Sequence, residues 1–328
     1  MWKNIKSNWQ LVIIMMAILV VILSDIIKST TPSTKEPLSA SLADSAWVAP
    51  SLYYDAVEGE ERKQIIYGEE LISHTSIYLG PKGSVAQISN GMNCQNCHLN
   101  AGKTNWGNNY SAVFSTYPKF RDRSGAVETI NKRVSDCFER SLNGTAPDSN
   151  SKEYQAIYAY IKWVGQDVKK GEKPIGSGIE KLPFLERAAD PIKGKQVYTI
   201  QCQSCHGSNG EGQLSLSGNN FEYPPLWGVH SYNSGAGLFR ISNLAGYVHS
   251  NMPFNQAKHS NPKLTIEEAW DVAAYVNSQP RPSKDLSKDW PDISKKPFDH
   301  PFGPYADGFT ETEHKFGPYK PIIAKQKN

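Results

Sequence analysis

The sequence has little net charge and few thiols. Its 35 lysines and arginines nearly balance 32 aspartates and glutamates, which gives a formal net charge of +3 at pH 7. Because the basic residues form no long runs, the sequence does not indicate nucleic-acid binding. Five cysteines in 328 residues are too few for a disulfide-rich scaffold. The length suits about two domains, and a hydrophobic content of 39% can supply a core for each.

Long apolar runs are also absent, with one exception at the N-terminus. Residues 9–27 form an apolar stretch that follows Lys3 and Lys6, a pattern typical of a signal peptide or signal anchor. No small-x-small cleavage site follows closely, so we expect an uncleaved anchor at residues 1–28 that contacts the membrane through residues 9–27. The Ser- and Pro-rich residues 29–48 are expected to form a tether. The alternative is a cleaved signal peptide; in both cases the remainder is exported.

Four of the five cysteines lie in two copies of one short motif, C-x-x-C-H, at residues 94–98 and 202–206. This motif is the attachment signature of c-type haem, whose vinyl groups bind both thiols while the histidine binds iron. A zinc site or a dithiol motif is the alternative, but no further cysteine pair completes a zinc site, and both copies carry the histidine. Covalent haem attachment also agrees with export to a bacterial periplasm. We therefore predict two covalently bound haems c, which use Cys94, Cys97 and His98 for haem 1 and Cys202, Cys205 and His206 for haem 2.

Each motif lies between segments of helical periodicity. Helices are predicted at residues 62–76 and 153–164 around the first motif, and at 191–200 and 265–278 around the second. Thr265 and Glu268 match a capping box. This pattern is typical of small cytochrome c domains, and it repeats as in a distant internal duplication.

We therefore expect a mainly α fold with two tandem class I cytochrome c-like domains at residues 49–170 and 186–282, joined by a linker at 171–185. The Pro- and aromatic-rich residues 283–328 are expected to form an extended tail that wraps over the domains. A disordered tail is the alternative.

Methionine is scarce, and its position favours a sixth ligand for haem 2. Met252 lies after the second motif and just before its closing helix, where an electron-transfer cytochrome c supplies its methionine. His230 and His249 are the competing ligands.

Haem 1 has no such methionine. Between His98 and His206 the sequence contains no other histidine and no methionine. The remaining candidates are a lysine, His74, an open site and Cys137, which is the only thiol outside the two motifs.

Cys137 lies on the apolar edge of a predicted helix over residues 130–142. Arg133 and Ser141 share its face at i−4 and i+4, and Arg123 lies upstream. A positive cluster lowers the pKa of a thiol and supplies donors for an anion. The alternative is a buried structural cysteine. With a haem beside it, the cluster favours a small sulfur-containing anion such as thiosulfate. Oxidation of two thiosulfates gives tetrathionate, whose central S–S bond a thiolate attacks by ordinary exchange.

Over about residues 50–320 the chain resembles the bacterial dihaem thiosulfate dehydrogenases, also described as tetrathionate reductases. The similar stretches are residues 93–99, 117–123, 133–144, 223–228 and 251–253. The stretch around Cys137 is the most specific, because C-x-x-C-H alone matches any cytochrome c.

The resemblance implies an enzyme that interconverts thiosulfate and tetrathionate, with a substrate pocket that uses Arg123, Arg133 and Ser141 around Cys137. It also implies His98/Cys137 ligation of haem 1 and His206/Met252 ligation of haem 2. In some relatives a lysine precedes the methionine and can replace it, but here that residue is Asn251. The redox partner, a cytochrome or a quinone-linked protein, is not indicated. A non-catalytic membrane-tethered dihaem electron carrier is the alternative function, and a dihaem peroxidase is a third.

Overall fold

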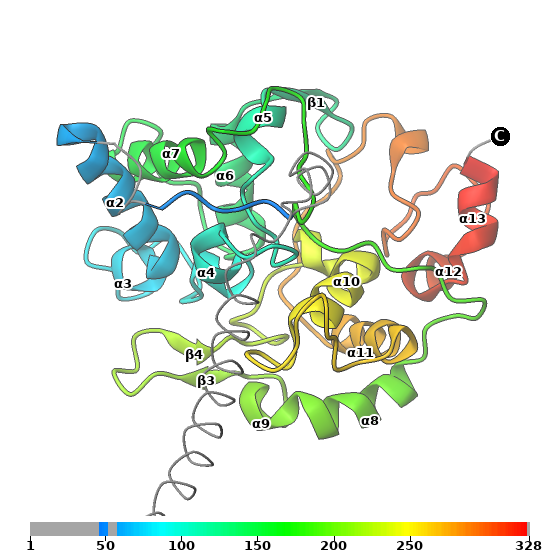
Figure 1. The fold of residues 1–328 in the computed structure, drawn as a ribbon. Coiled ribbons are helices and arrows are strands. Elements are labelled where there is room, and N and C mark those ends of the chain that lie inside the picture. The colour runs from blue at the N-terminus through cyan, green and yellow to red at the C-terminus, as the bar shows by residue number, and fades with distance from the viewer. Residues whose placement is uncertain (1–45, 52–57, 327–328) are drawn as a thin grey trace, which may run out of the picture. The chain divides into compact units, whose positions relative to one another are not determined.

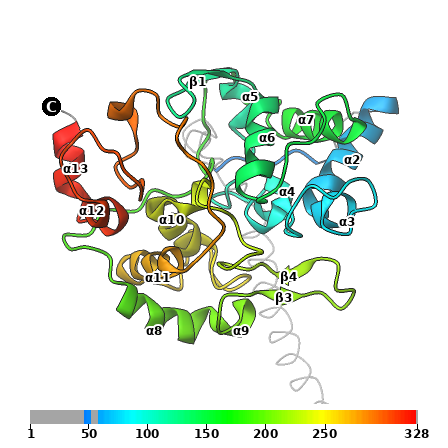
Figure 2. The ribbon, with the colours of Figure 1, turned by 180° about the vertical axis from the view of Figure 1, so that it is seen from behind.

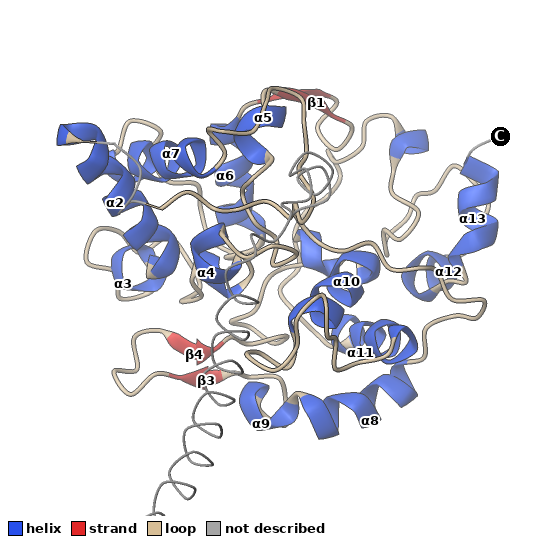
Figure 3. Ribbon diagram, viewed as in Figure 1, coloured by secondary structure: helices blue, strands red, loops and turns tan. Residues whose placement is uncertain are grey.

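The computed structural model describes residues 46–51 and 58–326, which are predominantly helical (Figures 1 and 3). The expected signal anchor at residues 1–28 and most of the expected tether lie outside the described residues. In the part of the chain that the structure describes, no helix combines the length and apolar character needed to cross a membrane.

The four helices that the periodicity predicts around the two motifs are present, with small differences at their ends. They are α2 (Gly59–Ser73), α7 (Lys152–Val164), α8 (Pro191–Gln201) and α11 (Ile266–Ser278). The predicted capping box at the start of α11 is confirmed, because the side chains of Thr265 and Glu268 each accept the other residue's backbone N–H.

In both helix pairs, α2 with α7 and α8 with α11, a glycine lies in close contact with the backbone of the partner helix. At Gly68 of α2, a Cβ atom would come within 2.1 Å of a carbonyl oxygen of α7 and 2.7 Å of Tyr160 Cβ. At Gly194 of α8, it would come within 1.9 Å of a carbonyl oxygen of α11 and 2.9 Å of Tyr275 Cβ. Only glycine permits such an approach. The repeated contact supports the predicted internal duplication. We call residues 58–169 the N-terminal half and residues 190–282 the C-terminal half.

Shorter elements lie between the helices of each pair. In the N-terminal half they are α3 (Thr75–Leu79), η1 (Cys94–Asn96), α4 (Leu99–Gly102), α5 (Val113–Thr116), β1 (Lys119–Arg121), β2 (Ala126–Glu128) and α6 (Ile130–Arg140). In the C-terminal half they are α9 (Gln203–His206), β3 (Gln213–Leu214), β4 (Phe221–Tyr223), η2 (Gly237–Phe239) and α10 (Ile241–Asn251). The strands form two antiparallel hairpins, β1–β2 and β3–β4 (Figure 3).

The tail differs from the expected extended structure in its last part. Residues 283–310 contain little regular structure besides η3 (Ile293–Lys295), but α12 (Glu311–Phe316) and α13 (Tyr319–Gln326) are helical (Figure 2). Thr310 caps α12 in a capping box with Glu313, a pattern that the sequence already contained. The buried side chains Tyr319 and Ile322 pack into the core of the C-terminal half. The expectation of an extended chain is therefore wrong for residues 311–326.

An ion cluster attaches the tail to the N-terminal half. The carboxylate of Asp289 accepts hydrogen bonds from both terminal nitrogens of Arg140, at 2.8 and 2.9 Å, and lies 3.8 Å from Nε of Arg123. The side chains of Asp289 and Arg140 are only 9% and 11% exposed. Loss of one partner would therefore leave a nearly buried charge without compensation.

We predict that Asp289→Ala lowers the free energy of unfolding by about 3 kcal/mol, because Arg140 loses its bidentate partner. Denaturant unfolding of the haem-loaded protein measures this change. Glu186→Ala is the matched control, since its ion pair with Lys320 is exposed and such pairs contribute about 0–1 kcal/mol. Equal destabilisation by the two substitutions would contradict the prediction.

Candidate functional site

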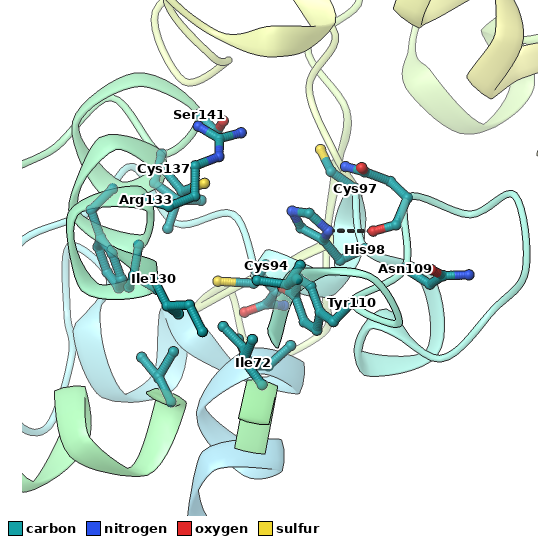
Figure 4. A pocket seen from close by; sticks show the side chains of 18 of the residues that line it. Ile72, Cys94, Cys97, His98, Asn109, Tyr110, Ile130, Arg133, Cys137 and Ser141 are labelled. Carbon is teal, nitrogen blue, oxygen red and sulfur yellow. Dashed lines mark hydrogen bonds between the residues drawn. The ribbon is translucent and has the colours of Figure 1, made fainter. Parts of the chain in front are cut away.

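A cavity of about 160 Å³ lies between the first C-x-x-C-H motif and α6 (Figure 4). Cys94, Cys97 and His98 line one side, and Cys137 of α6 lines the other. Much of the remaining wall is apolar and is formed by Ile72, Val113, Ile130, Val134, Ile157 and Ile161. Two thiols and an imidazole on one side of an apolar cavity match what covalent attachment of a c-type haem requires.

The first motif is held by contacts on both sides. The backbone N–H of Cys94 donates to Thr75 Oγ1 at 3.0 Å, and His98 Nδ1–H donates to the carbonyl oxygen of Asn108 at 2.6 Å. The ring of Tyr110 lies 4.6 Å from the His98 ring, centroid to centroid. Burial lowers the pKa of His98 to about 4. His98 is therefore neutral at pH 7, and the bond at Nδ1 leaves the Nε2 lone pair available to a metal ion.

The helix α6 presents Cys137 and Arg133 to the same cavity, and its C-cap residue Ser141 also lines it, as the helical spacing predicts. Figure 4 shows these side chains opposite His98. Thr129 is the N-cap of this helix, and its Oγ1 accepts the N–H of Lys132 at 3.2 Å, which fixes where the helix begins. Interaction with the Cys137 thiolate raises the pKa of Arg133 and outweighs the opposite effect of burial. Arg133 therefore keeps its positive charge at the cavity wall although it is buried.

Arg123 does not line this cavity. Its Nη1 donates to the carbonyl oxygen of Gly235 at 2.9 Å, and its guanidinium lies 4.9 Å from the centre of the Trp290 ring. Burial lowers the pKa of Arg123 to about 10, with a further contribution from Arg140. Of the two arginines implied by the resemblance, the structure places Arg133 at the cavity and Arg123 at a junction of the two halves and the tail.

A second, larger cavity of about 380 Å³ lies in the C-terminal half and reaches the first motif. Its lining includes Cys202, Cys205, His206 and Met252. His206 Nδ1–H donates to the carbonyl oxygen of Pro224 at 2.8 Å, and burial lowers the pKa of His206. The second histidine is thus held in the same way as the first.

One segment separates the two cavities. Met92 and Cys97 line both of them, so the attachment segment of the first motif is also a wall of the second cavity. From the C-terminal half, Tyr247 lines the second cavity and its hydroxyl donates to the carbonyl oxygen of Asn96 at 3.1 Å. The two candidate haem sites are therefore neighbours across a single stretch of chain.

The competing ligands lie elsewhere. Among the described residues, His74 and the lysines do not contribute to the lining of the first cavity. His230 and His249 are likewise absent from the described residues that line the second cavity. His249 Nδ1 instead bonds to the carboxylate of Glu180 at 2.8 Å.

Comparison with known proteins finds two cytochrome c domains, one in each half of the chain. The family model "SoxA/TsdA, cytochrome c domain" matches residues 84–169, and the model "Cytochrome c" matches residues 192–280. A thiosulfate dehydrogenase of Stutzerimonas stutzeri is 35% identical over 236 residues, which cover 70% of this chain and 73% of the relative. This chain belongs to the thiosulfate dehydrogenase family. Because cytochrome c domains bind c-type haem covalently, the predicted type of cofactor, covalently bound haem c, is confirmed.

Further thiosulfate dehydrogenases are similar to this chain. The enzyme of Psychrobacter arcticus is 39% identical over 206 residues, which cover 62% of this chain and 61% of the relative. The solved structure of the thiosulfate dehydrogenase (TsdBA) from Marichromatium purpuratum aligns with a TM-score of 0.67 and 32% identity. That alignment covers 76% of this chain and 52% of the solved chain, so this chain spans about half the length of that protein.

Several residues around this family member's cavities carry no signal in the sequence. Thr75, Asn108 and Tyr110 support the first motif, but a backbone carbonyl acceptor such as that of Asn108 has no sequence signature. Pro224 lies in the stretch 223–228 that carries the family resemblance, yet its role as the partner of His206 appears only in the structure. Glu180 lies in the predicted linker, where composition alone indicates a spacer.

We predict that the double variant Cys202→Ser, Cys205→Ser retains one covalently bound haem per chain, because we expect each motif to attach its own haem. Intact-protein mass together with a pyridine haemochrome assay measures the haem number. Cys137→Ala is the control and should keep both haems, since its thiol is outside the attachment motifs. A double variant that still carries two covalent haems would refute this assignment.

Proposed function

We propose that this chain interconverts thiosulfate and tetrathionate, with Cys137 as its reactive group and two haems c as its electron carriers. The observation that carries the proposal is the grouping of Cys137, Arg133 and Ser141 on the face of α6 that lines the first cavity, opposite His98. The names of the relatives support the same substrate and reaction.

The charges at the cavity suit a small anion that carries a reactive sulfur. Thiosulfate is a dianion with a nucleophilic terminal sulfur, and a guanidinium binds sulfonate oxygens with its fork of N–H donors. Arg133 is placed to bind the sulfonate, and the Ser141 hydroxyl is placed to donate a further hydrogen bond. In this arrangement the sulfur of the substrate lies next to the sulfur of Cys137.

The chemistry is a thiol–disulfide exchange that involves Cys137. In the reductive direction, the Cys137 thiolate attacks one central sulfur of tetrathionate, the central S–S bond breaks, and thiosulfate leaves. The bound half remains as a cysteine S-thiosulfonate, Cys–S–S–SO3−, in which the sulfur of Cys137 is bonded to the sulfane sulfur of that half. Two electrons then break that bond and release the second thiosulfate with the Cys137 thiolate. The oxidative direction reverses each step and yields two electrons for each tetrathionate formed.

The haems c, when bound, accept or donate these electrons one at a time. We assign His98 and Cys137 to the iron of haem 1, and His206 and Met252 to that of haem 2. Their cavities adjoin at Cys97, so these residues would hold the two haems as neighbours.

The remaining parts of the proposal concern the whole chain. We assign the cytochrome c domains to residues 49–170 and 186–282, with the linker at 171–185. Cytochrome c domains are typically periplasmic in bacteria, and we propose that residues 9–27 tether this chain to the inner membrane.

Arg123 is retained as a substrate-binding candidate near Arg133, although it lies outside the cavity lining.

We predict that Cys137→Ala lowers turnover in both directions by about 1,000-fold, because the other two cysteines that line the cavity, Cys94 and Cys97, are assigned to haem attachment. Assays with artificial electron donors and acceptors measure both directions. Ser135→Ala is the matched control on the same helix, since its hydroxyl bonds to Tyr154 rather than facing the cavity. Wild-type turnover in the Cys137→Ala variant, with both haems present, would rule out the mechanism.

We predict that Arg133→Met lowers kcat/KM for tetrathionate and thiosulfate by about 100-fold, because a charge-assisted contact with the sulfonate is lost. Arg133→Lys should show a smaller loss, since it keeps the charge without the fork. Arg187→Met is the control, because Arg187 pairs with Asp271 in the C-terminal half. Steady-state kinetics that are equal in the two Met variants would contradict the role of Arg133.

A further inference from the structure

The end of α10, which leads into Met252, is held by one residue of the linker. The carboxylate oxygen Oε2 of Glu180 accepts a hydrogen bond from His249 Nδ1 at 2.8 Å and another from Ser250 Oγ at 2.5 Å. Both donors lie in the last turn of α10, which ends at Asn251, immediately before Met252. The side chains of Glu180 and His249 are 17% and 11% exposed, so these bonds are largely shielded from water.

Further contacts hold Glu180 itself in place. Its Oε1 lies 3.4 Å from Nδ1 of His259, beyond Met252 in the sequence. At Gly246 of α10, a Cβ atom would come within 2.0 Å of the Glu180 carbonyl oxygen, so the linker backbone packs directly on the helix. Burial alone would raise the pKa of Glu180, but hydrogen bonds from Ser250 and His249 and the nearby histidines leave it below its usual value. Glu180 is therefore ionised at pH 7.

The third residue of this turn is bound to the N-terminal half. Asn251 Nδ2 donates to the carbonyl oxygen of Trp106 at 3.1 Å, and the Trp106 ring lies 4.2 Å from the His259 ring. Trp106 is close in sequence to Asn108, whose carbonyl accepts from His98. His249 and Ser250 are thus bonded to Glu180 of the linker, and Asn251 is bonded to the N-terminal half.

We propose that Glu180 is the positioning residue for Met252, because it fixes the end of the helix from which the methionine reaches the second cavity. The inference rests on the proposed ligation of haem 2 by Met252. A thioether is a neutral ligand that an added base can displace, so its bond to iron depends on how firmly the protein holds that segment. Loss of the carboxylate frees the last turn of α10 and makes opening of the Met252 segment more frequent.

Imidazole binding to the ferric protein measures this opening, because imidazole binds haem 2 only after the methionine leaves. The loss of the long-wavelength absorption band that a methionine–iron bond gives to ferric haem follows the binding at haem 2. We expect Glu180→Ala to raise the apparent imidazole affinity about tenfold, which corresponds to the loss of hydrogen bonds to a charged acceptor. Glu180→Gln, which keeps an acceptor for Ser250, should raise the affinity less.

Two further variants keep the proposal testable. Ser250→Ala removes one of the hydrogen bonds and leaves the carboxylate in place, and it should also raise the imidazole affinity. It tests the proposal even where Glu180→Ala does not load haem. Glu222→Ala removes an exposed carboxylate that borders the same cavity, so it reports the effect of charge alone and should not change the affinity.

The outcomes separate this inference from the proposed function. Wild-type imidazole affinity in Glu180→Ala and Ser250→Ala, or an equal increase in Glu222→Ala, overturns the positioning role and leaves the thiosulfate chemistry untouched. A wild-type protein without the methionine band overturns both the ligand assignment and this inference. Thiosulfate turnover that is absent while the methionine band and the Glu180 effect are present overturns only the proposed reaction.

Discussion

The functional arrangement depends on how each C-x-x-C-H segment is held. Two thiols and an imidazole on five residues can serve only one side of a cavity, and a backbone carbonyl fixes the imidazole in each case, that of Asn108 for His98 and that of Pro224 for His206. The opposite side must then come from a distant part of the chain. In the N-terminal half it comes from α6 with Cys137, and in the C-terminal half from the segment after α10. This difference makes two similar halves chemically unequal.

The two halves contact each other where the two candidate haem cavities adjoin. Met92 and Cys97 belong to the N-terminal half yet line the cavity of the C-terminal half, and Tyr247 binds back to the first attachment segment. The core of the N-terminal half also includes Phe221 and Phe239 of the other half. Such packing fixes the separation of the two cavities, which a flexible linker alone would leave variable.

The arginines near Cys137 have different roles because their partners differ. Asp289 of the tail neutralises Arg140 and approaches Arg123, and Glu128 lies 3.9 Å from Nε of Arg121. Arg133 is the member of this cluster that lines the cavity, where its charge interacts with Cys137. Asp289 of the tail and Glu128 are thus the partners of the neighbouring arginines, whereas Arg133 faces the cavity.

The sequence by itself determined the cofactor type, the paired helices and the face of α6 that carries Cys137. These follow from local rules, because haem attachment needs five adjacent residues and a helix repeats its face every three to four residues. It did not reveal that Arg123 turns toward Gly235 and Trp290, that Asp289 of the tail binds Arg140, or that Glu180 of the linker binds the end of α10. Only the tertiary structure decided these features, because each depends on contacts between residues that are far apart in the chain.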